Sequence, residues 1–331
     1  MLKPQQTDQG HLLSIEDLKV VFDHNGQVSR AVDGVSLEVG QGETVCLVGE
    51  SGCGKTVTAL SILGLIPQPP GRITQGRISF QGRDLLGLNE RQIQSIRGKS
   101  IGMVFQDPMT SLNPVFPVGE QIEEVLLAHE ELPRSEVRAR TLKALSDVGI
   151  PSPEDRVRSY PHQLSGGQRQ RVMIAMALIC NPDLVIADEP TTALDVTIQA
   201  QILKLFKSIQ NQAARSILYI THDLGVVSSI ADRVLVMYAG VIVEQGRAAD
   251  IFDHARHPYT QGLLASLPTV AKKGTRLSSI PGAVPNPAHK PRGCPFHPRC
   301  QFARPSCRTD FPELIRCSRD HSTRCPVLSC W

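Results

Sequence analysis

The sequence predicts an α/β fold in which β-strands alternate with helices, followed by an irregular, cysteine-rich C-terminal extension. One observation is a glycine-rich loop at residues 49–56, between an apolar β-branched run and a run that can form a helix. Another is a series of later apolar runs that end in polar residues, as the buried strands of an α/β sheet do. The third is a group of six cysteines between Cys294 and Cys330.

Composition bounds the class of protein. The 331 residues are 41% hydrophobic and 20% charged, which is ordinary for a globular chain of two or three domains. The net charge is +3, and from His289 onward eight Lys or Arg face three Asp or Glu. The rest of the chain is therefore slightly negative, and we expect no nucleic-acid partner. Residues 1–6 lack the apolar region of a signal peptide, and no run reaches the roughly 18 apolar residues of a membrane span, so we expect a soluble cytosolic chain.

The glycine-rich loop carries the strongest signal. It reads Gly49, Glu50, Ser51, Gly52, Cys53, Gly54, Lys55 and Thr56. This fits the pattern G-x-x-x-x-G-K-[ST], whose backbone N–H groups surround the phosphates of a nucleotide. Residues 44–48 are expected as the preceding strand, and residues 57–63 as a helix whose dipole faces the anion. Lys55 would reach the outer phosphates, and the Thr56 hydroxyl would bind Mg²⁺.

The residues around this loop predict further strands. Residues 18–22 and 31–39 are expected as short strands that precede the loop. Phe22 is the aromatic residue here that could stack on a purine, although a core-facing strand position explains it equally well. Residues 67–76 are expected as a turn-rich link, followed by a strand at 77–80.

A strand expected at residues 101–105 ends at Gln106, because Pro108 cannot continue a central ladder. A glutamine at the carboxyl end of a strand points into the ligand crevice of an α/β sheet, where it can sense Mg²⁺ or the attacking water. Residues 107–163 then show helical spacing of apolar residues and are expected as a helical insert.

A second helix start follows at residues 164–168. Ser165 and Gln168 form the pattern of a capping box. Gly166 and Gly167 leave the helix N-terminus open, so that another anion can approach it. Capping alone would not require two consecutive glycines.

Residues 184–189 are expected as a buried strand that ends in two carboxylates. Since adjacent strand residues point to opposite sides, Asp188 and Glu189 should differ in role. Asp188 would hold Mg²⁺ through water, and Glu189 would polarise the attacking water.

The last part of this region contains a capped helix, a histidine and a hairpin. Residues 193–195 are expected to cap a helix. His222 follows a strand at 217–220, and its position beside a phosphate site favours a hydrogen bond to the terminal phosphate over a purely structural role. A hairpin over 233–245 closes the region.

These motifs, in this order, make residues 12–250 resemble an ATP-binding cassette (ABC) transporter ATPase. The resemblance narrows to the di-/oligopeptide and nickel importer group, and within it to the dipeptide-permease D-type ATPases. It is carried by residues 106–114, 188–201, 256–260 and 293–300. It implies a P-loop NTPase core with an N-terminal antiparallel β subdomain and a helical subdomain. The expected ATPase domain is 1–260, with its insert at about 107–163, and the extension is 261–331.

The resemblance also implies an activity and an assembly. Such a chain hydrolyses ATP with Mg²⁺, with Glu189 as base and with Gln106 and His222 in the site, and so drives solute import. It works as a head-to-tail pair in which Ser165 and Gly167 of the mate cover the γ-phosphate. The expected partners are a paralogous ATPase, two transmembrane permease subunits and, indirectly, an extracytoplasmic solute-binding protein. The expected location is the cytoplasmic face of the cytoplasmic membrane.

Two alternatives to peptide import remain open. Nickel and other solute systems share the same motifs. A soluble ABC ATPase of translation or DNA repair would typically carry two cassettes or a long coiled-coil insert, and neither is present in the sequence.

The cysteine group suggests a cofactor. In a reducing cytosol it favours metal or redox chemistry over disulfides. No C-x-x-C pair is present, which counts against an ordinary zinc ribbon, and thiolates with longer gaps suit an iron–sulfur cluster. The resemblance points the same way, because some peptide-importer ATPases carry a [4Fe–4S] cluster in this extension. The expected ligands are Cys294, Cys300, Cys307 and Cys325. Cys317 and Cys330 are then spare, and zinc or free thiols in a docking tail are the alternatives.

Overall fold

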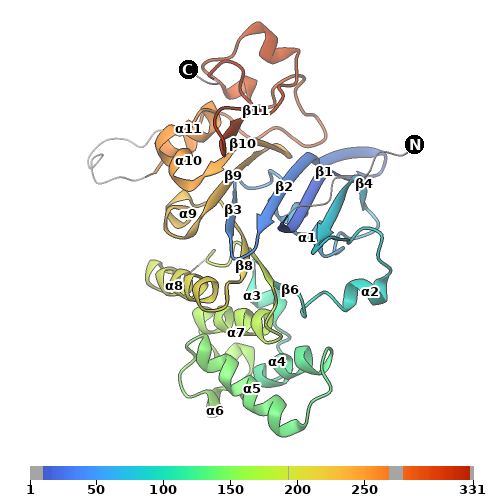
Figure 1. The fold of residues 1–331 in the computed structure, drawn as a ribbon, viewed down its shortest axis with the longest axis vertical. Helices are drawn as coiled ribbons and strands as arrows, with labels where there is room; N and C mark the ends of the chain where they lie inside the picture. Colours follow the sequence, from blue (N-terminus) through green and yellow to red (C-terminus); the bar gives the residue numbers. More distant parts are fainter. Residues whose placement is uncertain (1–9, 193, 268–278, 329–331) are drawn as a thin grey trace. The chain divides into compact units, whose positions relative to one another are not determined.

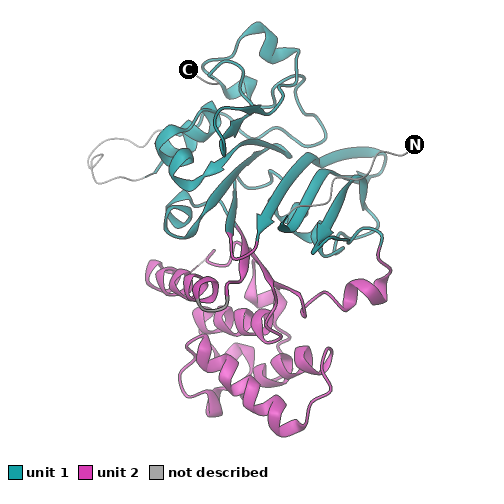
Figure 2. Cartoon of the chain, viewed as in Figure 1, with its two compact units in different colours: residues 1–40, 44–87, 220–331 teal, residues 41–43, 88–219 magenta. Residues whose placement is uncertain are grey.

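The computed structural model describes residues 10–192, 194–267 and 279–328. These residues form two compact units (Figure 2). The first contains residues 10–40, 44–87 and the described residues from 220 on, and the second contains residues 41–43 and 88–219. Ala193, Cys330 and residues 1–6, on which some of the sequence predictions fall, lie outside the described residues.

The first unit begins with an antiparallel sheet of strand order β2-β1-β4-β5 (Figure 1). Its strands are β1 (His11–His24), β2 (Gln27–Gly40), β4 (Gly71–Phe80) and β5 (Arg83–Asp84). Asn25 and Gly26 join β1 to β2, and both have positive φ, as a tight hairpin turn requires. The antiparallel sheet agrees with the predicted β subdomain, but β1 and β2 are each 14 residues long rather than short.

The predicted turn-rich link at residues 67–76 is wrong for its second half. Strand β4 already starts at Gly71, opposite Phe22 of β1. Further along, Asp17 and Leu18 lie across from Gly76, because the pairing shifts register between Lys19–Gln75 and Glu16–Arg77. Such a bulge lets the two strands stay paired past residues with weak strand signals. The glycines and polar residues of residues 71–76 are not typical of a strand, so the sequence does not indicate this part of β4.

A second set of strands in the first unit carries the phosphate loop. β3 (Thr44–Val48) is buried throughout and pairs in parallel with β9 (Arg233–Tyr238). β9 turns at Ala239 and Gly240 into β10 (Val241–Arg247), which forms the predicted hairpin. The short strands β12 (Ser322–Thr323) and β11 (Ile315–Arg316) extend this sheet beyond β10.

Helices complete the first unit. They are α1 (Lys55–Ile62), α9 (Leu224–Ile230), α10 (Ala248–His254) and α11 (Pro258–Ala265). Besides β11 and β12, the described residues of the extension form the 3₁₀ turns η3 (His297–Arg299) and η4 (Pro305–Arg308), and the chain between these elements is irregular, as predicted.

The second unit combines strands with the helical segment. β6 (Ile101–Val104) pairs in parallel with β7 (Leu184–Asp188), and β8 (Ser216–Thr221) lies beside β7, with its last two residues assigned to the first unit. The helices are α2 (Glu90–Gln94), α3 (Pro108–Ser111), α4 (Val118–Leu127), α5 (Arg134–Asp147), α6 (Pro153–Arg156), α7 (Gly166–Leu178) and α8 (Val196–Ala213), with the 3₁₀ turn η1 (Pro161–Gln163). Residues 107–163 are thus helical, and α4, α5 and α7 pack on one another (Figure 1). Across the described ranges, every helix is too short or too polar to pass through a lipid bilayer.

The bulge at Gly76 gives a test of the β1–β4 pairing. Gly76 has φ +114°, and an added Cβ would lie 2.7 Å from Leu18 Cα. Gly82 also has positive φ, but its added Cβ would meet nothing within 4 Å. We expect Gly82→Ala to lower the free energy of unfolding by about 1 kcal/mol through strain alone. Gly76→Ala should cost roughly 1–3 kcal/mol more, because backbone must also move. Urea unfolding of both variants measures this, and equal losses would contradict the bulge.

Candidate functional site

The phosphate loop follows β3 and leads into α1, as the sequence predicts. Lys55 is 4% exposed and folds back on the loop. Its Nζ donates to the carbonyl oxygens of Gly49 at 2.8 Å and Glu50 at 3.0 Å. Ser51, Gly52 and Thr56 are exposed at the start of the helix. The loop therefore presents backbone and a hydroxyl to solvent beside a lysine ammonium, which is the arrangement that binds phosphate groups.

Two glycines are required by close backbone neighbours. A Cβ at Gly49 would lie 2.2 Å from the carbonyl oxygen of Met237. A Cβ at Gly54, which has φ +110°, would lie 2.5 Å from the carbonyl oxygen of Ala31. Neither backbone atom can move away cheaply, so both positions exclude every residue with a side chain. The spacing of glycines in the motif thus follows from packing as well as from phosphate access.

The loop has two distant partners that the sequence did not indicate. The Glu50 N–H donates to the hydroxyl of Tyr259 at 2.8 Å, and the Glu50 carboxylate pairs with Arg299. Burial raises the pKa of Tyr259, so its hydroxyl stays protonated. These residues are more than 200 positions from the loop in sequence. No local pattern marks them as belonging to the site.

Two further predicted site residues belong to the first unit. His222 directly follows β8 and is exposed. Phe22 lies in β1 and is half-buried, and its ring lies so close to Gly71 that an added Cβ there would be 2.8 Å from it. A role of His222 at the terminal phosphate and a role of Phe22 beneath the base stay predictions.

The second unit brings Gln106 and Glu189 together. Gln106 Nε2 donates to Glu189 Oε2 at 3.3 Å, and the Thr192 hydroxyl donates to the same oxygen at 2.9 Å. A carboxylate fixed from two sides is positioned to orient a water molecule. No sequence pattern marks Thr192 as a site residue, although it lies only three residues beyond Glu189.

The expectation that Asp188 and Glu189 alternate as strand residues is wrong. Strand β7 ends at Asp188, which is 2% exposed. Glu189 lies beyond the strand with φ +45°, a left-handed conformation that non-glycine residues rarely adopt. The two carboxylates still differ in environment, but a turn and not the pleat of a strand separates them. Strain of this kind is typical of functional positions.

Residues 164–168 form the predicted helix start. Ser165 caps α7 by accepting from the Gln168 N–H at 3.3 Å, and the Ser165 N–H donates to Gln168 Oε1 at 3.0 Å. A Cβ at Gly167 would lie 2.9 Å from Ile198 Cγ2 in α8, whereas Gly166 has no neighbour closer than 4.0 Å. Packing therefore accounts for Gly167, and Gly166 leaves the helix start open. Binding of an anion here stays a prediction. Asp195 caps α8 by accepting from the Ile198 N–H, as predicted.

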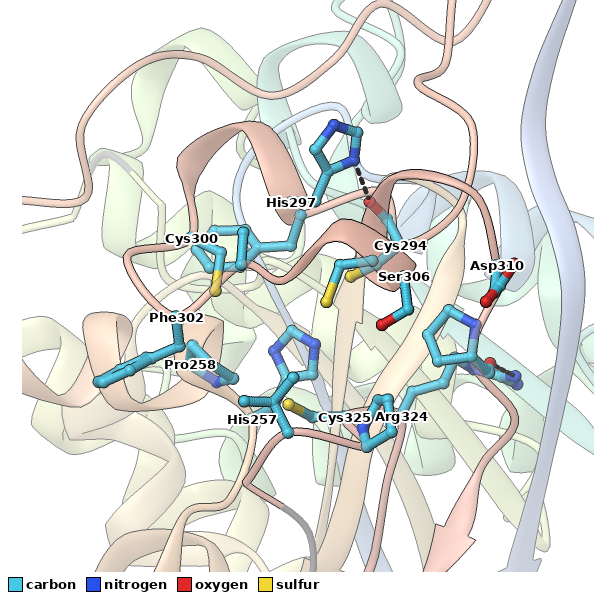
Figure 3. Close-up of a pocket in the computed structure, with 16 residues that line it drawn as sticks. His257, Pro258, Cys294, His297, Cys300, Phe302, Ser306, Asp310, Arg324 and Cys325 are labelled. Carbon is cyan, nitrogen blue, oxygen red and sulfur yellow. Dashed lines mark hydrogen bonds between the residues drawn. The ribbon is translucent and has the colours of Figure 1, made fainter.

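The four cysteines predicted as ligands line one cavity in the first unit. Cys294, Cys300, Cys307 and Cys325 surround a volume of about 240 Å³, together with His257 and Phe296. Figure 3 shows the sulfur atoms of Cys294, Cys300 and Cys325 facing the same space. His297 turns away, with its Nδ1 3.0 Å from the Cys294 carbonyl oxygen. Cys317 is not part of the lining.

Burial controls the ionisation of these groups. It raises the pKa of the Cys294 thiol to about 11 and also raises the pKa values of Cys300 and Cys325. The thiols therefore favour the neutral form near pH 7, and a positively charged group in the cavity would favour the thiolates. In the described part of the chain, no three His, Cys, Asp or Glu side chains are arranged closely enough to hold one metal ion.

Comparison with known proteins identifies the family. A profile described as "ABC transporter" matches residues 32–192, and one described as "Oligopeptide/dipeptide transporter, C-terminal region" matches residues 243–307. The "Dipeptide transport ATP-binding protein DppD" of Bacillus subtilis (strain 168) is 51% identical over 95% of this chain and 94% of its own length. The "Oligopeptide transport ATP-binding protein OppD" of the same organism is 52% identical over 96% of this chain and 89% of its own length. The chain belongs to the ABC transporter ATPase family.

Solved ABC ATPases share the fold. The cassette MJ0796, in a dimeric post-hydrolysis state bound to ADP and Pi, is 27% identical, with a TM-score of 0.65, over 71% of this chain and 98% of its own. The cbiO1 protein of Clostridium perfringens is 30% identical, with a TM-score of 0.63, over 74% and 92%. Both results confirm the predicted ABC ATPase fold.

The cavity gives this ABC ATPase a predicted pH dependence. Burial lowers the pKa of His257 from 6.5 to about 4, although Glu244 opposes the shift. Between these pH values the unfolded chain binds a proton that the folded chain excludes, so the free energy of unfolding falls as the pH is lowered through this window. The contribution is at most roughly 3–4 kcal/mol. Because His257 Nδ1 accepts the Tyr259 N–H, asparagine can replace its capping role.

Urea unfolding from pH 7 to 4 tests this, with His257→Asn compared to the parent chain. The variant should lose less stability on acidification, and His24→Asn, at the exposed end of β1, serves as the control. The same pH slope in the parent and His257→Asn would contradict the assignment.

Proposed function

We propose that this chain is the ATP-hydrolysing subunit of an importer of di- or oligopeptides. The observation that carries the proposal is the joint match of a cassette at residues 32–192 and a peptide-transporter C-terminal region at residues 243–307. Relatives whose names specify dipeptide or oligopeptide transport align over 95% or more of the chain, so the likeness includes the extension. The chain then acts at the cytoplasmic face of the membrane through permease subunits.

The phosphate loop binds the nucleotide, and the carboxylates take part in its hydrolysis. Backbone N–H groups of residues 49–56 and the Lys55 ammonium hold the phosphates. Thr56, Gln106 and Asp188 would hold Mg²⁺, which would supply charge neutralisation at the phosphates when bound. Glu189 accepts a proton from the attacking water, and the hydrogen bonds from Gln106 and Thr192 orient its carboxylate for that role. His222 hydrogen-bonds the terminal phosphate, and Phe22 lies beneath the base.

A second subunit completes the site. The open start of α7, with Ser165 and Gly166 exposed at the helix N-terminus, suits the γ-phosphate of a nucleotide held by a mate. The dimeric state named for MJ0796 supports such a pair. The mate is a paralogous ATPase, and the other partners are two permease subunits and, beyond the membrane, a solute-binding protein.

Replacing the proposed base tests the activity. Glu189→Gln should leave ATP binding intact and slow ATP hydrolysis by the assembled transporter roughly a hundredfold or more, because the amide cannot accept the proton. Glu120→Gln, on the exposed face of α4, is the matched control. Cells that carry Glu189→Gln should lose uptake of a labelled dipeptide. Unchanged ATP turnover would refute the role of Glu189. If the cells lose uptake of nickel but not of the dipeptide, the transported solute is nickel and not a peptide.

We also propose that the cavity of the extension holds a [4Fe–4S] cluster. Four cysteines line it, and a structural zinc site would instead need its ligands within about 2.3 Å of one ion. No such compact group occurs within the described ranges, whereas the volume of about 240 Å³ suits a larger group. The cluster would supply a positively charged core that keeps the four sulfurs as thiolates and ties the irregular extension together.

Iron and sulfide analysis of anaerobically purified protein tests the cluster. The parent chain should contain about four irons and be brown. Cys307→Ser should lose iron and colour, whereas Cys317→Ser, whose cysteine lies outside the cavity lining, should keep both. Colourless, iron-free, folded parent protein would refute the cluster, and zinc in its place would assign the cavity to that metal.

A further inference from the structure

The side chain of Arg299, in the extension, contacts the phosphate loop. Arg299 forms a two-pronged ion pair with the Glu50 carboxylate, with Nη1–Oε2 at 2.7 Å and Nη2–Oε1 at 3.0 Å. The Arg299 side chain is 5% exposed and that of Glu50 is 31% exposed. A bidentate pair with one partner buried is geometrically specific and stronger than a surface ion pair. It joins residues that are 249 positions apart.

Arg299 is itself held in place by its surroundings. Its Nε donates to the Pro281 carbonyl oxygen at 2.8 Å, and an Nη donates to that of Ile280 at 3.3 Å. The guanidinium also lies over the rings of Tyr238 and Phe296, within 6 Å of each centroid. The guanidinium fork of Arg299, meaning its two Nη groups, is therefore held in place by contacts other than the pair with Glu50. The pair with Glu50 is the first cause of a raised pKa of Arg299, so the guanidinium stays charged.

The same segment is part of the cysteine-lined cavity. Arg299 immediately precedes Cys300, and Phe296 lines the cavity. The Phe296 ring also contacts the rings of Tyr238 and Tyr259 at centroid distances of 5.2 and 5.4 Å. Tyr259 in turn accepts the Glu50 N–H. Both contacts of Glu50 with the C-terminal part of the chain thus lead back to residues packed at the cavity wall.

Glu50 places a carboxylate in a loop whose ligand is an anion. Without a partner, that negative charge would repel the phosphates, and its side chain would be free to leave its rotamer. The Arg299 fork neutralises the carboxylate and anchors the second residue of the loop, while the Tyr259 hydroxyl holds its backbone N–H. Lys55 also bonds the Glu50 carbonyl oxygen, so Glu50 is fixed at three points.

We propose that Arg299 is a positioning residue for the phosphate loop, and that nucleotide affinity therefore depends on the order of the cysteine-lined extension. This inference rests on the proposed ATP site and adds that a second region of the chain controls its affinity. Loss of order around Cys300 releases the fork, leaves the Glu50 carboxylate unpaired, and weakens nucleotide binding at a loop whose own sequence is unchanged.

The test is equilibrium binding of a fluorescent ATP analogue with Mg²⁺ to the full-length chain. Arg299→Gln should weaken binding about tenfold, because it leaves the carboxylate unpaired beside the phosphates. Adding Glu50→Gln to that variant should restore much of the affinity, since the repelling charge is then gone. A merely structural role of Arg299 predicts a double variant at least as weak as the single one, and that result would overturn the proposal. Arg299→Lys keeps the positive charge and loses the two-pronged geometry, so its nucleotide affinity should lie between those of the parent and Arg299→Gln. It replaces Arg299→Gln in the test if that variant does not fold.

Controls separate this inference from the proposed function. Arg308→Gln removes another arginine of the extension, whose side chain forms no hydrogen bond or ion pair with any other described residue, and should bind like the parent. Lys55→Ala should abolish binding, and retained binding there would refute the nucleotide site itself. If Lys55→Ala abolishes binding while Arg299→Gln has no effect, only the positioning role fails.

A separate variant tests whether nucleotide affinity depends on the extension. Cys300→Ser should weaken binding in the parent chain and add no further loss in the Arg299→Gln background, because both act through the same pair. Equal affinity of Cys300→Ser and parent would show that the cavity does not act on the loop.

Discussion

The backbone contacts of the phosphate loop constrain the whole first unit. Gly49 lies against the carbonyl oxygen of Met237 in β9, and Gly54 lies against that of Ala31 in β2. The antiparallel sheet and the sheet that contains β3 therefore both touch the loop with backbone atoms. Since main-chain contacts cannot be relieved by choosing another rotamer, the loop keeps its curvature only while both sheets are in place. The shape of an anion site is thus set by backbone atoms of two strands, with the Met237 side chain also lying against Gly54.

Much of the architecture could be predicted because its signals are local. The run 44–48, the capping pattern of Ser165 with Gln168 and the cap at Asp195 depend only on neighbouring residues, and each lies where expected. The strand at Gly71–Gly76 was missed because tertiary pairing with β1 overrides weak local propensity. The turn at Glu189 was missed because no short-range signal marks a left-handed glutamate.

The site residues divide in the same way. Those in the loop are contiguous, so one motif reveals them together. Tyr259 and Arg299 reach Glu50 from the far end of the chain, and only the folded structure brings them there. Gly167 shows that a residue can have a second role that its local pattern does not indicate. The sequence connects Gly167 with an anion, and the structure adds a packing contact with Ile198.

The separation of Cys317 from the other cysteines has a physical cause in the C-terminal hairpin. The Cys317 and Ser318 N–H groups both donate to the His321 carbonyl oxygen, which closes the turn between β11 and β12. Cys317 is thereby part of that turn, whereas Cys325 follows directly after the stretch that pairs with β10. His321 also meets the fully buried Glu244 at 2.8 Å, which fixes the hairpin against the sheet.

This pairing with β10 has a further consequence. Ser322 and Thr323 pair with Gln245 and Glu244, the Arg324 N–H donates to the Val243 carbonyl oxygen, and Arg324 Nε donates to that of Ile242. The C-terminal segment thus covers what would otherwise be an open sheet margin with unpaired donors and acceptors. Open margins are templates for strands of other molecules, and proteins avoid self-association by blocking them. With β12 paired to β10 and β11 paired to β12, the margin of this sheet in the described residues is the two-residue strand β11, which offers another molecule far less to pair with than the seven-residue β10 would.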